Sequence, residues 1–238
     1  RPQMRRDGEG HEVGRDSEGP GHRQLHDGLG AALARLGAQH LVPLGRARLE
    51  KAGKQSIPAV RKLLTHPNSF IQGRAIWLLS KLGSEGLKIV ENQLKHQDER
   101  IRVCAFRALR HNDHRIIEHA AKLAKDPSPS VRREVALAMR YQPFEKARDI
   151  LLEISKGYDG EDRYYLEAFG IGCTDKEEKI YAELKKYLRT QKYDPRYAGL
   201  VWRLHTASSV SEIKSWVLDE KLSQKIHRSM LFALSLIE

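Results

Sequence analysis

The sequence repeats itself at a spacing of thirty residues, and this repeat constrains the fold more than any other feature. The segments FIQGRAIWLLSKLG, RIRVCAFRALR and SVRREVALAMR start at residues 70, 100 and 130. In each segment apolar residues recur at every fourth position, which places them on one face of an α-helix. The matching positions are Ile71, Ile101 and Val131, then Ala75, Ala105 and Val135, then Leu79, Leu109 and Met139.

Each of these helices follows a short turn that contains Pro, Asp or Asn. The turns read THPNS, HQDE and DPSPS. Residues of this kind precede helices because a side-chain oxygen can accept hydrogen bonds from the free N–H groups of the first turn. We predict that Ser69 and Ser130 are N-caps and that Asp98 or Glu99 caps the middle helix.

Between these first helices lie second helices, expected over residues 85–95, 115–125 and 144–156. No strand-like alternation of apolar and polar residues is present. A single helix pair cannot bury its own apolar face, whereas stacked pairs form a continuous core. The sequence therefore predicts an all-α protein, an α-solenoid of helix pairs.

The pattern continues toward the C-terminus with less regularity. The segment 56–64 looks like a second helix that has lost its partner. For the first helix expected at 162–172, Glu161, Tyr165 and Phe169 take the repeat positions. We count about six repeats over residues 56–238. The remaining expected first helices are 162–172, 194–205 and 224–237, and the remaining second helices are 176–191 and 211–222.

Residues 1–55 differ in composition from the rest of the chain. They hold 10 of the 18 glycines and no Phe, Trp, Tyr or Ile. Residues 1–24 have too few apolar side chains to offset the entropy of ordering, so we expect disorder there. Residues 25–55 show a weak helical pattern interrupted by glycines, and we expect a poorly formed helical segment. The abrupt change in composition also suggests the hypothesis that residues 1–55 are an out-of-frame translation.

The stretch DPSPSVRREVALAM resembles the HEAT repeat, in particular the short bacterial form called the lyase HEAT-like repeat. Asp126-Pro127 in the turn, Val131-Arg132 at the helix start, and Val135 and Met139 carry the resemblance. The segments 64–79 and 97–110 are variants of the same unit. This resemblance implies an α-solenoid of HEAT-like pairs.

The order of the segments also resembles the HEAT-repeat region of large bacterial multidomain proteins. Those proteins carry a membrane-bound-dehydrogenase-like propeller before the repeats and a haem-binding cytochrome c module after them. YDGEDRYYLEAFGIG (158–172) is the most specific matching piece. The resemblance implies that the chain is a fragment of such a protein, acting as a docking module in the bacterial envelope or in secreted form. No CxxCH motif is present, so no haem or enzymatic role passes to any residue here.

The densest polar cluster is HNDHRIIEH, residues 111–119. His114 and Glu118 are four residues apart and would share a helix face, while His111 lies in the preceding turn and His119 would point to one side. Imidazole and carboxylate groups at this spacing could hold zinc or another divalent metal. There is no HExxH motif, so the expected alternative is an exposed polar turn, and we assign no metal and no cofactor.

The turn YDGED offers three carboxylates, which could attract calcium. It lacks the spaced ligands of an EF-hand loop and occupies the place of an inter-repeat turn. We therefore expect Asp159 or Glu161 to lie near a helix N-terminus, where a negative charge is favoured.

The net charge of +11 favours an acidic partner, and residues 56–238 carry +8 of it. Arginines recur on the first helices, and tyrosines could stack on bases or pack against a protein. The candidate partner-binding residues are Arg102, Arg107, Arg132, Arg133 and Tyr164.

Three functions remain open from the sequence. We favour a non-catalytic scaffold that binds a protein partner, or neighbouring domains of its own polypeptide, through an extended and slightly concave face. The alternatives are a basic solenoid that binds nucleic acid and a structural part of a haem-dependent dehydrogenase. No catalytic motif is present, the two cysteines fit no metal spacing, and no apolar run is long enough to span a membrane.

Overall fold

The protein is described by a computed structural model that covers residues 42–188 and 193–237. These residues form helices, short 3-10 turns and connecting loops, and no strand. The expected disorder of residues 1–24 lies outside this range, as do residues 25–41 of the expected poorly formed segment 25–55. The described part of that segment contains the helix α2 (Val42–Ala52). None of the described helices is long and apolar enough to cross a membrane.

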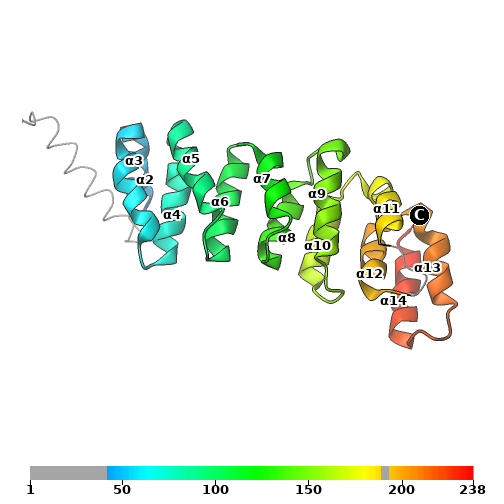
Figure 1. Ribbon diagram of the computed structural model, residues 1–238. Coiled ribbons are helices and arrows are strands. Elements are labelled where there is room, and N and C mark those ends of the chain that lie inside the picture. The colour runs from blue at the N-terminus through cyan, green and yellow to red at the C-terminus, as the bar shows by residue number, and fades with distance from the viewer. Residues whose placement is uncertain (1–41, 189–192, 238) are drawn as a thin grey trace, which may run out of the picture.

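The helices follow one another in pairs along the molecule, with α3 and the C-terminal helix α14 at opposite ends (Figure 1). The all-α prediction is confirmed, and each expected helix between residues 70 and 237 is present. The first helices are α4 (Ser69–Leu79), α6 (Glu99–His111), α8 (Pro129–Ala138), α10 (Arg163–Gly172), α12 (Pro195–Leu204) and α14 (Gln224–Ser235). The second helices are α5 (Gly83–Gln93), α7 (Ile116–Leu123), α9 (Phe144–Lys156), α11 (Glu177–Tyr187) and α13 (Val210–Val217).

The start of the described chain corrects one expectation. The segment 56–64 is not a helix without a partner, because α2 (Val42–Ala52) precedes α3 (Ile57–Lys62) and both contact α4. The side chain of Leu49 on α2 is fully buried. The Ser56 hydroxyl donates to the Leu49 carbonyl over 3.1 Å, which joins the end of α2 to the next turn.

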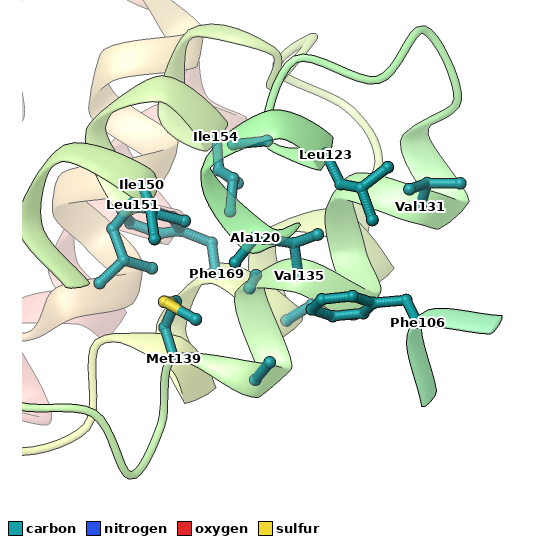
Figure 2. Packing of buried hydrophobic residues seen from close by; sticks show 14 of the residues in the cluster. Phe106, Ala120, Leu123, Val131, Val135, Met139, Ile150, Leu151, Ile154 and Phe169 are labelled. Carbon is teal, nitrogen blue, oxygen red and sulfur yellow. The ribbon is translucent and has the colours of Figure 1, made fainter. Parts of the chain in front are cut away.

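The first helices form one layer, in which each contacts the next from α4 through α14. The repeat positions 75, 105, 135 and 165 are buried, as are 79, 109, 139 and 169. Figure 2 shows how Val135 of α8 and Met139, which follows α8, lie among residues of α6, α7, α9 and α10. Contacts between consecutive pairs therefore complete the core, as the repeat pattern predicts, and the packing is that of a helical repeat.

The N-caps differ in part from the prediction. Asp98 caps α6, as expected, and accepts a hydrogen bond from the backbone N–H of Arg100 over 2.8 Å. Ser69 and Ser130 are not caps; Asn68 caps α4 and Ser128 caps α8. In α8 the reason is Pro129, which starts the helix at N1 because it has no N–H to satisfy, so the cap falls on the residue before it.

The segment 158–172 contributes mostly to the core. Tyr158 and Tyr165 are buried and stack with ring centroids 6.1 Å apart. Asp162 caps α10, and Asp159 accepts hydrogen bonds from the N–H groups of Glu161 and Asp162, so the turn is closed internally. A Cβ on Gly172 would lie 2.4 Å from the carbonyl oxygen of Ala136, which explains why a glycine stands where α10 meets α8.

The two cysteines pack as small apolar residues and form no disulfide with each other. Cys173 is fully buried, and the half-buried thiol of Cys104 lies 3.8 Å from the carbonyl oxygen of Gly73. Burial raises the pKa of both thiols, so both stay protonated at neutral pH.

The repeat register can be tested at Ala105, which is fully buried in α6. We expect Ala105→Asp to lower the free energy of unfolding by more than about 3 kcal/mol, because it buries an unpaired carboxylate. Ala121→Asp in α7 is the control, since Ala121 is exposed, and it should cost about 1 kcal/mol or less. Urea denaturation followed by circular dichroism measures both, and equal costs would show that the register is wrong.

Candidate functional site

Arg102 is a buried link between two consecutive turns. Its guanidinium makes two hydrogen bonds to the carboxylate of Asp126, of 2.8 and 2.7 Å, and both side chains are nearly inaccessible to solvent. The same guanidinium donates to the carbonyls of His96 and Gln97. The turn before α6 is therefore fixed to the turn before α8 by one side chain.

Arg132 makes an equivalent link in the following repeat. It donates to the carbonyls of Asp126 and Pro127 in its own turn, and to the Gly157 carbonyl and the Tyr165 hydroxyl in the next repeat. In the repeat before Arg102, the matching residue is Gln72, which donates to a carbonyl of its own turn over 2.7 Å. The residues at this repeat position, Gln72, Arg102 and Arg132, therefore bind backbone carbonyls of the turns and fix the position of each turn.

These contacts change the assignment of two of the five candidate partner-binding residues. Arg102 and Arg132 bind groups within the chain, so their donors are not directed at a partner. Arg107 is half exposed and its guanidinium lies 2.7 Å from Glu134, and Arg133 lies 3.6 Å from Asp162. Tyr164 is 78% exposed. Arg107, Arg133 and Tyr164 therefore remain accessible from outside.

The C-terminal ends of α4, α6 and α8 carry a set of exposed cations, which we call the basic edge: Lys81, Arg107, Arg110 and Arg140. Lys81 lies 3.3 Å from the His111 ring, which joins the end of α4 to the end of α6. Arg107 and Arg110 share the carboxylate of Glu134, whose side chain is only 3% exposed. The carboxylate thus lies beneath its two arginines, and the outer surface of the edge is cationic.

The two helix layers differ in charge. The five first helices from α4 to α12 contain ten arginines, no lysine and three glutamates. The five second helices from α5 to α13 contain nine basic and ten acidic residues. Aspartates in the turns pair with Arg100, Arg102 and Arg196, but the sequence has no acidic residue in 70–84, 100–112 or 135–144, which contain the basic edge.

A separate polar cluster joins α5 to α7. Nε2 of His114 lies 2.9 Å from Oε1 of Glu91, and Nε2 of His119 lies 3.1 Å from the same oxygen. A guanidinium nitrogen of Arg115 lies 3.0 Å from it as well. His119 is buried, whereas Glu91 and His114 are partly accessible. We call Glu91, His114 and His119 the Glu91 cluster.

The cluster differs from the one expected at HNDHRIIEH. His111, His114 and Glu118 do not come together, because α7 begins at Ile116 and His114 therefore lies before the helix. Arg115 has a left-handed backbone (φ 49°), which turns the chain between His114 and α7. His111 contacts Trp77 and Lys81 instead, and Glu118 pairs with Arg115. His119, which we expected to point aside, faces His114 across Glu91.

The protonation states in the Glu91 cluster follow from its surroundings. Burial raises the pKa of Glu91, but the hydrogen bond with His114 and the charges of His119 and Arg115 outweigh it, so the pKa lies below its usual value. Burial lowers the pKa of His119, and the nearby Glu91 offsets this only partly. At neutral pH the cluster therefore combines an ionised carboxylate with a neutral buried imidazole.

Two carboxylates that join separate helices were not identified from the sequence. Glu91 stands 23 residues before His114, and no local spacing connects them; the shared feature is only that both flank α6. Glu212 is also buried, and accepts hydrogen bonds from the hydroxyls of Tyr181 and Tyr197, each over 2.9 Å. The two hydrogen bonds to Glu212 join α11, α12 and α13.

Comparison with known proteins does not identify a family. No family model and no curated protein matches the chain. Among solved structures, the chain is similar to an engineered protein at 16% identity, with a TM-score of 0.40, over 87% of this chain and 67% of the other. A second engineered protein matches at 15% identity, with a TM-score of 0.31, over 93% and 92% of the two chains.

The link between turns can be tested at Arg102. We expect Arg102→Met to cost about 3–5 kcal/mol of unfolding free energy, because it leaves the Asp126 carboxylate buried without its cation. The control is Arg100→Met, which removes an exposed pair with Asp98 and should barely shift the urea midpoint. If both variants unfold at the same urea concentration, the buried pair does not hold the turns.

Proposed function

We propose that the protein is a non-catalytic scaffold whose first-helix layer binds an acidic protein surface, either on a separate partner or on a neighbouring domain of the same polypeptide. The basic edge carries this proposal. Three successive repeats present Lys81, Arg107, Arg110 and Arg140 on one side, and the carboxylate that pairs with two of them is buried.

The composition of the edge is that of a binding surface. Tyr141 is 85% exposed and lies beside Arg140, whose guanidinium is 5.4 Å from the ring centroid. Tyrosine and arginine are enriched at the centres of protein interfaces. Tyrosine buries a large area and loses little conformational entropy. An arginine can also bind a carboxylate through two parallel hydrogen bonds, which favours acidic partners.

The arrangement favours an acidic protein over nucleic acid. A phosphate-binding surface gains from many free cations along its length, and each contact adds to the salt dependence of binding. Here Arg102 and Arg132 are directed inward, and Arg107 and Arg110 of α6 share a glutamate. The edge thus offers a local patch of cations flanked by tyrosine, which fits a patch of carboxylates on a protein.

The test compares two double variants with the same change in charge. Lys81→Glu with Arg140→Glu reverses two cations of the basic edge. Lys122→Glu with Lys146→Glu reverses two exposed cations on the second helices α7 and α9. A fluorescent glutamate-rich peptide serves as the probe, and its binding is followed by anisotropy at about 50 mM salt.

We expect the edge variant to bind the peptide roughly tenfold or more weakly than the unmodified chain, and the second-helix variant to change within about twofold. Equal losses in both variants would contradict a defined binding face, as would no binding by the unmodified chain. Tighter binding to duplex DNA than to the peptide, with a steep fall as salt rises, would favour the nucleic acid function instead.

A further inference from the structure

We propose that Glu91, His114 and His119 form a binding site for a single divalent transition metal ion, zinc in the first place, which joins α5 to the start of α7. Nothing in the proposed scaffold function requires this site, and it stands on a separate set of contacts.

The three donor atoms already converge. The two Nε2 atoms lie 2.9 and 3.1 Å from Oε1 of Glu91, and the ligand atoms all lie within 4.8 Å of one another. Zinc binds imidazole nitrogen and carboxylate oxygen at about 2.0–2.2 Å, so a tetrahedral site separates its donors by roughly 3.4 Å. The two nitrogen–oxygen distances need to lengthen by only a few tenths of an ångström to admit the ion.

The donors have the chemistry that zinc prefers. Two neutral imidazoles and one carboxylate are a known zinc ligand set with three protein ligands, in which water takes the fourth position. Glu91 and His114 are partly accessible, at 19% and 25% of their side-chain surface, which leaves a path for the ion and room for that water. His119 is buried behind them, so its ring has few alternative partners.

Arg115 explains how the cluster is stable without metal. Its guanidinium supplies a positive charge 3.0 Å from Oε1 of Glu91, and it also pairs with Glu118 on the outside of α7. The Arg115 side chain is half exposed. It can move fully to Glu118 when a metal takes over the Glu91 oxygen, and this exchange keeps the Glu91 carboxylate neutralised in both states.

The position in the fold gives the ion a structural role. Second helices α7, α9 and α11 contact one another in sequence, whereas α5 and α7 lack comparable backbone contact within the described chain. The Glu91 cluster is a polar connection between them. A metal ion there would connect the two second helices across the end of α6, and would make this region of the array more resistant to unfolding.

The experiment measures the zinc-induced rise in melting temperature of the full chain, after metal removal with EDTA and dialysis. Two variants remove ligands, Glu91→Gln and His114→Ala. Two matched controls remove a histidine and a carboxylate that lie outside the cluster: His111→Ala, and Glu85→Gln at an exposed position of α5. Each variant is measured with and without zinc, so a general loss of stability is separated from a loss of the zinc response.

Affinity is measured by competition with a zinc-binding dye. Because the chain has eleven histidines, the site is identified from differences between variants and not from total zinc uptake. We expect a site with a Kd of about 1 µM or below. The two ligand variants should weaken it by roughly tenfold or more, while the two controls stay within about twofold.

Three outcomes overturn the proposal. The first is no rise in melting temperature with zinc for the unmodified chain. The second is a rise that survives in both Glu91→Gln and His114→Ala. The third is an equal loss of the rise in His111→Ala, which would place the metal elsewhere on the same turn.

Discussion

Every helix pair in the described chain depends on a neighbouring pair to bury its apolar face. The residues at positions 75, 105, 135 and 165 are buried because each first helix packs against the one that follows. Buried polar contacts accompany this apolar layer: Arg102 pairs with Asp126 and donates to two carbonyls of its own turn. The apolar contacts supply most of the stabilisation, and the arginine couples consecutive turns, since moving them apart would leave the buried Asp126 carboxylate without its cation.

The same alignment decides which charges reach the surface. Arg102 and Arg132 are held by the turns, and Glu134 lies beneath Arg107 and Arg110. The face of the first helices is therefore cationic even though several of its arginines are paired. The second helices carry a near balance of charge. A scaffold function and a metal-bridged joint between α5 and α7 make separate demands on the chain, because the basic edge and the Glu91 cluster share no residue.

The sequence predicted much of this fold and less of its sites. Leu79, Leu109 and Met139 recur at a fixed spacing, so the buried faces could be assigned before the structure was known. The caps were wrong by one or two residues at Ser69 and Ser130, because Asn68 and the pair Ser128-Pro129 compete locally for the same role. Of the three metal candidates only His114 belongs to the Glu91 cluster, since a left-handed residue at Arg115 breaks the helical spacing between His114 and Glu118.

By itself the sequence determined that the described chain after residue 69 is helical, where those helices lie and which of their faces are buried, because apolar periodicity is a local property of the residues. Only the tertiary structure decided which polar groups meet. Glu91 reaches His114 and His119 across α6, and Arg102 reaches Asp126 across a whole helix pair. Contacts of this kind depend on the angle and spacing between helices. Packing sets both quantities, and no local sequence pattern predicts them.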